Sequence, residues 1–181
     1  MHASGFCLFD TPIGQCAIAW SAAAIVGVLL PEDDPQQTAP RMQRRFPQAR
    51  QIAPPHWVAQ VIERTRALLN GATTDTLADV PLDMAGVPEF NQRVYAIARA
   101  IAPGQTLSYG EVAAMLGEPG AARAVGQALG HNPFAPIVPC HRVLAAGKRS
   151  GGFSAGGGVA TKLRMLQIEK AQLGDGPGLF D

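Results

Sequence analysis

The stretch SYGEVAAMLGEPGAARAVGQALGHNP, residues 108–133, contains start and end signals for two short helices. Ser108 and Glu111 fit the S-x-x-E capping box that opens a helix, and this role accounts for Glu111 better than catalysis does. The turn GEPG separates the two helices, and Asn132 precedes a proline, which favours extended backbone there. Two short helices joined by a glycine turn are the helix-turn-helix pattern, although many helical hairpins share it.

The second of these helices carries unusually small side chains. Its alanines and glycines keep it thin, and Arg123 is the only Lys, Arg, Asp or Glu between Glu118 and Arg142. A thin helix can pack closely on another helix, or its backbone can approach a nucleic-acid groove with Arg123 projecting from the first turn. An arginine without an acidic neighbour in sequence favours the second interpretation.

Towards the N-terminus the pattern changes to strands. Apolar runs at residues 5–10, 15–20 and 25–30, with the turn TPIG between the first two, predict an antiparallel meander. Residues 31–40, PEDDPQQTAP, are expected to be a polar connection. Residues 56–70 have helical apolar spacing and precede Gly71, and residues 75–84 are expected to return to a strand.

These elements predict an α/β protein in two parts and a tail. Residues 1–85 form a small unit of β-meander plus helix. Residues 86–172 form a mostly helical, winged-helix-like unit with the helix-turn-helix, opened by a helix that starts near Pro88. Residues 173–181 are a tail.

Cys140 lies in IVPCHRVL, residues 137–144, and is the strongest candidate for chemistry. The neighbouring prolines predict a constrained, extended segment, on which His141 points away from the Cys140 sulfur unless the backbone turns or a water bridges them. Cys7 and Cys16 suit burial in apolar strands. No partner cysteine or metal-ligand spacing surrounds Cys140, so a nucleophile remains the best interpretation.

A carboxylate that could support this thiol is Glu169, in the helix expected over residues 159–173. Glu169 lies about 60° from Leu166 around that helix, at the edge of its apolar stripe. Position alone therefore favours a solvated glutamate over a buried one. The glycine-rich stretch SGGFSAGGG, residues 150–158, matches no phosphate-binding motif and is expected to be a loop that contacts substrate, with Ser154 at its centre.

Composition narrows the classes of protein. The chain has 181 residues, a net charge of +1 and three cysteines, an odd number that argues against a secreted disulfide framework. Residues 87–170 carry nine Lys or Arg and four Asp or Glu, which suits an anionic partner such as nucleic acid. The longest apolar run is too short to cross a membrane, for which ~20 residues are needed. A cytoplasmic protein with reduced thiols is expected.

Taken together, these motifs resemble the O6-alkylguanine-DNA alkyltransferases, or methylated-DNA–protein-cysteine methyltransferases. PCHRV matches the family's active-site motif, and SYGEVAAMLG, AARAVGQAL, NP, GGFS and KLRMLQIE match in order and spacing. LFDTPIG is similar to the family's N-terminal opening. The resemblance is strong over residues 88–170 and looser over residues 1–85.

The resemblance implies a monomeric repair protein that binds double-stranded DNA through the minor groove and flips an O6-alkylguanine out of the duplex. Cys140 would take the alkyl group once and irreversibly, and O4-alkylthymine is a further candidate substrate. No cofactor and no metal are implied.

Roles for individual residues also follow from the resemblance. His141 corresponds to the family's water-mediated base, Glu169 to its partner, and Tyr109 to the tyrosine that helps guanine leave. Asn132 corresponds to the asparagine that orders the turn before the cysteine. The base would contact Ser154, Val143 and Phe153, and the DNA would contact Arg123, Ala122 and Gly126.

The chain departs from the family pattern in the glycine-rich stretch. Phe153 stands where many members have tyrosine and Ala155 where they have glycine. A non-catalytic module that binds alkylated DNA, like the alkyltransferase-like proteins, is the alternative function. Those relatives lack the reactive cysteine, so Cys140 distinguishes the two.

Overall fold

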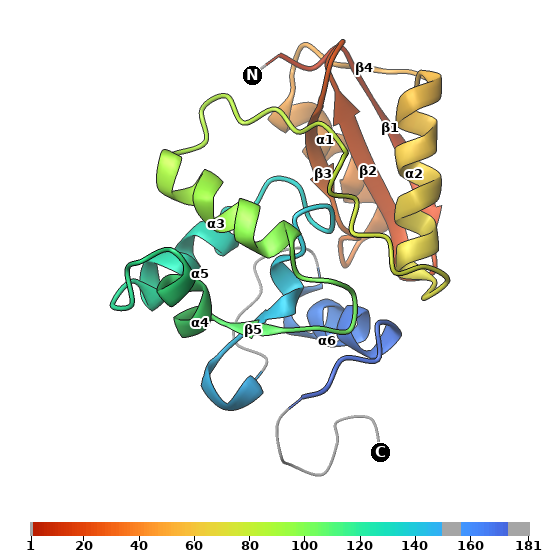
Figure 1. Cartoon of the computed structure of the whole chain (residues 1–181). Coiled ribbons are helices and arrows are strands. Elements are labelled where there is room, and N and C mark those ends of the chain that lie inside the picture. The colour runs from red at the N-terminus through yellow and green to blue at the C-terminus, as the bar shows by residue number, and fades with distance from the viewer. Residues whose placement is uncertain (1, 150–156, 174–181) are drawn as a thin grey trace.

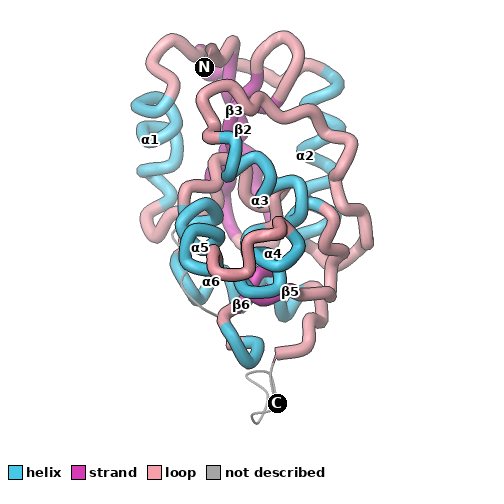
Figure 2. Tube along the Cα trace, turned by 60° about the vertical axis from the view of Figure 1, so that its left-hand side comes forward, coloured by secondary structure: helices cyan, strands magenta, loops and turns pink. Residues whose placement is uncertain are grey.

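The computed structural model describes residues 2–149 and 157–173. A sheet with one helix against each face forms the N-terminal part, and a group of short helices forms the C-terminal part (Figures 1 and 2). No helix in the described ranges is both long and apolar enough to span a membrane.

The predicted meander is confirmed. Strands β1 (Gly5–Thr11), β2 (Gly14–Trp20) and β3 (Ile25–Leu29) pair antiparallel in sequence order. A two-residue strand that was not predicted, β4 (Arg50–Gln51), adds to β1 in parallel, so the sheet order is β3-β2-β1-β4.

Alternation along the strands sends side chains to two different cores. One β2 face, with Ala17 and Ala19, packs against α1 (Thr38–Arg45) through Met42. The other face, with Ile18, packs against α2 (His56–Leu69) and the C-terminal part. This period of two is the pattern expected for a strand buried on both faces.

Helix α1 corrects the prediction of a polar connection over residues 31–40. A short 3-10 helix (Pro35–Gln37) follows the Asp34 cap, and α1 begins at Thr38. Prolines are tolerated in the first turn of a helix, where the missing N–H has no partner to lose. Few apolar residues mark α1, so the sequence pattern missed it. Helix α2 and its C′ glycine, Gly71 with φ +69°, are as predicted.

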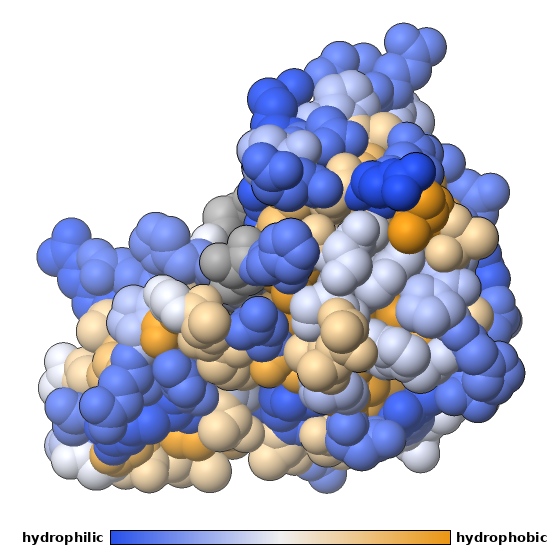
Figure 3. Space-filling model, turned by 90° about the horizontal axis from the view of Figure 1, so that it is seen from above, coloured by the Kyte–Doolittle hydropathy of each residue, from blue (hydrophilic) through white to orange (hydrophobic). Residues whose placement is uncertain are grey.

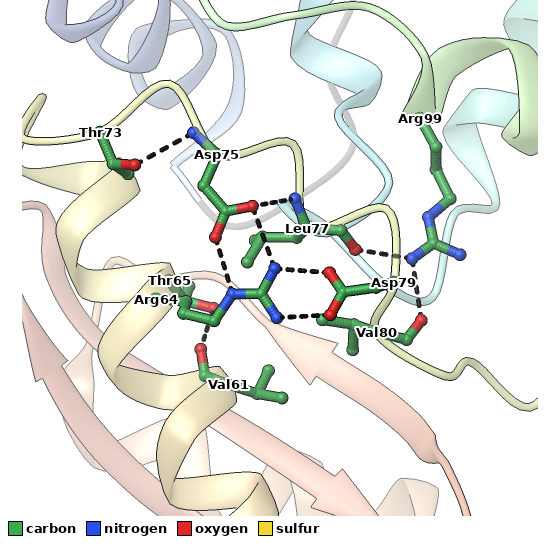
Figure 4. Close-up of polar contacts among 9 residues, drawn as sticks. All are labelled: Val61, Arg64, Thr65, Thr73, Asp75, Leu77, Asp79, Val80 and Arg99. Carbon is green, nitrogen blue, oxygen red and sulfur yellow. Dashed lines mark hydrogen bonds and ion pairs between the residues drawn. The ribbon is translucent and has the colours of Figure 1, made fainter.

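The strand predicted over residues 75–84 is wrong, because a side-chain cluster holds this segment as a loop (Figure 4). Arg64 of α2 donates to both carboxylate oxygens of Asp75, at 2.7 and 3.0 Å, and to those of Asp79, at 3.1 and 2.6 Å. Arg99 donates to the carbonyl of Leu77 at 2.8 Å. A single bridge, Ile25 with Leu82, is all that pairs with the sheet in this segment.

The C-terminal part contains the predicted helix-turn-helix. Helix α4 (Tyr109–Met115) begins with the complete Ser108–Glu111 capping box, and α5 (Ala122–Gly130) follows the glycine turn. Helix α3 (Glu89–Arg99) packs against both, and a parallel pairing of β5 (Leu107–Ser108) with β6 (Val143–Leu144) links α4 to the cysteine segment. Helix α6 (Gly158–Ile168) ends the described fold and is shorter than predicted.

The main core crosses the predicted boundary at residue 86. A single cluster of buried residues includes Ile18 and Val61 from the N-terminal part and Val94, Val112 and Cys140 from the C-terminal part. The two parts therefore share one interior, and Cys140 borders it.

On the surface, hydrophilic residues cover most of the face seen in Figure 3, with hydrophobic residues lying among them.

Candidate active site

Cys140 begins a single 3-10 turn, Cys140–Arg142, directly after Pro139. The extended segment predicted from the prolines is therefore wrong at the cysteine itself. The turn forms because the Arg142 N–H donates to the Pro139 carbonyl at 2.9 Å, and the Cys140 N–H donates to the Val138 carbonyl at 2.8 Å. Cys140 is 7 % exposed, so the thiol lies within the protein interior.

Asn132 bridges the chain between α5 and this turn. Its amide nitrogen donates to the Val138 carbonyl at 2.8 Å, and its Oδ1 accepts from the Phe134 N–H at 2.9 Å. One side chain thus holds both ends of the segment before Cys140. A hydrogen bond between Asn132 and the thiol also lowers the pKa of Cys140, against the larger opposing effect of burial.

His141 is buried and faces Glu169 rather than the thiol. Its Nε2 lies 2.8 Å from Glu169 Oε1. Burial lowers the pKa of His141 and outweighs the attraction of Glu169, so the imidazole is neutral near pH 7. The neutral tautomer that fits the carboxylate carries its proton on Nε2, which leaves the lone pair on Nδ1. Within the described residues, Nδ1 is buried with no hydrogen-bond partner.

Glu169 is buried, which corrects the solvated glutamate favoured by its helical position. Its side chain is 4 % exposed and lies at the C-cap of α6, just beyond the last helical residue. Arg142 Nε and Nη2 donate to its two oxygens at 3.0 and 2.8 Å. Burial favours a higher pKa, but His141 and Arg142 outweigh it and lower the pKa of Glu169 to about 2. Arg142 also donates to the Ile101 carbonyl at 2.7 Å, so the carboxylate is tied to α3.

Lys162 is a candidate functional residue that the sequence reasoning missed. It is 1 % exposed, its Nζ donates to the Val143 carbonyl at 2.9 Å, and the same atom lies 5.8 Å from the centre of the Tyr109 ring. Burial lowers the pKa of Lys162 to about 8, and the charge of the Cys140 thiolate acts in the opposite direction. One signal was available: Lys162 is one helical turn before the buried Leu166, on the apolar stripe.

Burial raises the pKa of all three cysteines, and different groups oppose it. The pKa of Cys7 rises to about 11 against the positive charge of Arg66, and that of Cys16 to about 12 against a hydrogen bond with Thr11. At Cys140 burial also raises the pKa, but the hydrogen bond of Asn132 and the positive charge of Lys162 both act to lower it. Cys140 thus combines the two kinds of opposing group.

The helix-turn-helix lies close to Cys140, through Tyr109. Tyr109, the first residue of α4, is half-buried, and the Cys140 thiolate charge contributes to a raised pKa of Tyr109 after the larger effect of burial. A Cβ on Gly126 of α5 would lie 3.9 Å from the Tyr109 ring. Ala122 and Gly126 are half-buried, and Arg123 is exposed on the first turn of α5.

The remaining predicted site residues are placed as follows. Val143 is fully buried in β6, and its carbonyl accepts from Lys162. Phe153 and Ser154, with the loop proposed to contact the base, lie outside the described residues. Among the residues that are described, no group of three or more His, Cys, Asp or Glu side chains is arranged to hold a metal ion.

Comparison with known proteins agrees with this arrangement. Residues 89–171 match the family "6-O-methylguanine DNA methyltransferase, DNA binding domain". The methylated-DNA–protein-cysteine methyltransferase of Mycobacterium tuberculosis is 36 % identical over 180 residues, which cover 95 % of this chain and 96 % of the relative.

Solved structures give the same result. The crystal structure of the M. tuberculosis O6-methylguanine methyltransferase superposes with a TM-score of 0.73 at 36 % identity, covering 98 % of this chain and 99 % of that one. A structure of the M. tuberculosis protein in complex with DNA superposes with a TM-score of 0.72 at 35 % identity, covering 92 % of each chain. The chain therefore belongs to the family of the methylated-DNA–protein-cysteine methyltransferases.

Proposed function

We propose that the protein repairs DNA by transferring the alkyl group of O6-alkylguanine, chiefly methyl, to Cys140 in a single irreversible turnover. The observation that carries this proposal is the buried Cys140 thiol, followed in the chain by a neutral His141 that is itself paired to Glu169. The family supports the proposal, since its named relatives are methyltransferases of this kind. O4-alkylthymine presents the same kind of alkyl carbon and is a second candidate substrate.

The chemistry is a displacement at a saturated carbon. His141 takes the thiol proton through a water at Nδ1, and Glu169 stabilises the imidazolium that results. The Cys140 sulfur then forms a bond to the alkyl carbon as the bond from that carbon to guanine O6 breaks, with the electron pair leaving on guanine. The Tyr109 hydroxyl supplies a proton to the departing base. A thioether remains on Cys140, and no group at the site can hydrolyse it, so each molecule acts once.

Access to a base inside a duplex requires that the base leave the stack. We infer that α5 enters the minor groove, where its small residues Ala122 and Gly126 allow the backbone to approach. Arg123 then fills the space vacated by the flipped base. Its exposure on the first turn of α5 supports this role. The base itself would contact Val143, Phe153 and Ser154.

The proposal also includes the domain organisation, the oligomeric state and the cellular location of the protein. We propose that residues 1–85 and 86–172 act as one monomeric unit in the cytoplasm, with residues 173–181 as a tail. The sparse, free cysteines support a reducing compartment.

The test is to mix the protein with an excess of duplex DNA containing O6-methylguanine, digest it, and locate the added methyl group by mass spectrometry. One methyl group on the peptide that holds Cys140, reached at one equivalent of DNA, is the expected result. Variants Cys7→Ala and Cys16→Ala should behave like the wild type, and Cys140→Ala should accept none.

Three results would contradict the proposal. They are several turnovers per protein, a methyl group that persists in Cys140→Ala, and tight binding of methylated duplex without any transfer. The last would indicate the non-catalytic damage-binding module.

A further inference from the structure

Besides the apolar packing of the shared core, the backbone carbonyl of Pro133 joins the N-terminal part to the segment before Cys140 by hydrogen bonds. The Val28 N–H, on the outer edge of β3, donates to this carbonyl at 2.9 Å. Arg45 Nη2, from the last residue of α1, donates to the same oxygen at 3.3 Å. A carbonyl oxygen accepts two hydrogen bonds through its two lone pairs, so both are used by the N-terminal part.

Arg45 is built into this contact. Its guanidinium carbon lies 5.0 Å from the centre of the Phe46 ring. Gly27 of β3 lies against both groups, since an added Cβ there would come within 3.0 Å of the same guanidinium carbon and 2.9 Å of the Phe46 ring. Glycine at this position leaves the space that the guanidinium and the ring occupy.

The charge environment of Arg45 also distinguishes it from a surface arginine. Burial is the main effect that lowers the pKa of Arg45, and the nearby charge of Arg41 adds to it. Across the described part of the chain, its guanidinium makes one hydrogen bond, to the Pro133 carbonyl. Its neighbour Arg44 is on the same helix but exposed.

Pro133 lies between Asn132 and Phe134, whose hydrogen bonds shape the segment before Cys140. Asn132 precedes it and binds the Val138 carbonyl, and the Phe134 N–H that follows it donates back to Asn132. A displacement of the Pro133 carbonyl therefore moves Asn132, and with it the turn that presents Cys140. We propose that Arg45 is a positioning residue for alkyl transfer, acting through Pro133 and Asn132 from a part of the chain that contains none of the reacting groups.

This inference rests on the proposed alkyl transfer to Cys140, and its test separates the two. Arg45→Ala is compared with Arg44→Ala, which removes the same charge from the same helix without touching Pro133. The first measurement is the second-order rate constant of methyl transfer from O6-methylguanine duplex. Small displacements of reacting groups lower the rate of a reaction strongly. The rate constant of Arg45→Ala should therefore be lower by about tenfold or more, while that of Arg44→Ala should match the wild type.

The second measurement is hydrogen–deuterium exchange of the backbone amides between residues 134 and 140. Exchange there should be faster by about fivefold or more in Arg45→Ala, since the Pro133 carbonyl loses one of the two hydrogen bonds that it accepts from the N-terminal part, and unchanged in Arg44→Ala. Arg45→Lys, which keeps a charged donor on a long side chain, should recover part of both effects. It also serves as the informative variant if Arg45→Ala fails to fold.

The outcomes are distinct. Equal transfer rates in Arg45→Ala and Arg44→Ala, or slow transfer with unchanged exchange in the 134–140 segment, would overturn the positioning role. A wild-type protein that transfers no methyl group at all would instead contradict the proposed function. In that case the exchange comparison still decides whether Arg45 orders the segment.

Discussion

Two basic side chains near Cys140 are buried, and burial lowers the pKa of each, with different consequences. His141 starts from an ordinary pKa of 6.5 and becomes a neutral base at pH 7. Lys162 falls from 10.5 to about 8, so it remains largely charged at the same pH. The site thus contains a proton acceptor and a positive charge at once. The charge opposes the desolvation that raises the thiol pKa of Cys140.

Removal of the Lys162 charge should therefore weaken the nucleophile. In Lys162→Met, which keeps an unbranched apolar side chain, we expect the apparent pKa of Cys140 to rise and the rate of alkylation at pH 7 to fall. The measurement is the rate of transfer from free O6-benzylguanine between pH 6 and 10. The whole profile should move to higher pH. Lys170→Met makes the same change at an exposed residue and should leave the profile in place. A lower rate at every pH, with no displacement of the curve, would contradict an electrostatic role.

At the scale of elements, the residues of the helix-turn-helix that stabilise the fold lie on a different side of α5 from the residue proposed to act on DNA. Helix α4 begins with a capping box that satisfies its first N–H groups, and α5 contributes Val125 and Leu129 to the core. The opposite side of α5 carries Arg123, which is exposed. Arg123 can therefore be changed without disturbing either helix.

Arg123→Ala should impair repair of a base inside a duplex much more than repair of a free base. Its proposed role is to stabilise the flipped state, and a free base needs no flipping. We expect transfer from O6-methylguanine duplex to slow by about tenfold or more, a loss of ~1.4 kcal/mol or more in the activation free energy. Transfer from free O6-benzylguanine should be nearly unchanged.

The control for this experiment is Arg44→Ala, which removes a positive charge outside the proposed DNA surface. Its effect on both substrates should be small. If Arg123→Ala slowed the two substrates equally, the loss would lie in the chemistry of the site, and the assignment to base flipping would be wrong.

At the scale of the whole molecule, a few buried polar contacts join segments that are far apart in the chain. Glu169 binds Arg142, which also binds the Ile101 carbonyl at the end of α3. Arg99 holds the loop between α2 and α3 through the carbonyls of Leu77 and Val80, each at 2.8 Å. Breaking one of these contacts leaves a buried donor or charge without its partner, which is more costly than losing an exposed ion pair.

Acid should reveal the contribution of Glu169. Its folded pKa is about 2, below the ordinary 4.5, so its contribution to stability is complete above pH 4.5 and is lost as the pH falls through about 2. The difference corresponds to roughly 3 kcal/mol. Glu169→Gln should therefore be less stable than the wild type by about that amount at pH 7, and the gap should narrow towards pH 2. Urea unfolding at a series of pH values measures it.

Glu63→Gln is the matched control, since the Glu63 side chain is 68 % exposed and pairs with Arg66 at the surface. It should shift the free energy of unfolding little at any pH. A Glu169→Gln gap that stayed constant between pH 7 and pH 2 would show that the loss comes from packing and not from the charge.

Local signals in the sequence determined the elements whose stability is local. The Ser108–Glu111 box, the meander with its Pro-Gly turn and the C′ glycine at Gly71 were all predicted, because each depends on residues within a few positions of one another. The motif around Cys140 also indicated the family, which the comparison with relatives confirms. These features could be predicted without knowing which residues pack against them.

Only the tertiary structure decided the burial and partners of groups that meet across the chain. The pattern placed Glu169 at a solvated helix edge, but Arg142 and His141, 27 and 28 residues away, bury it. It placed residues 75–84 in a strand, but Arg64 holds them as a loop. The sequence pattern singled out neither Lys162 nor Arg45. In each case the deciding contact comes from a distant segment, and the balance of desolvation against a charged or hydrogen-bonding partner does not exist until folding brings that segment close.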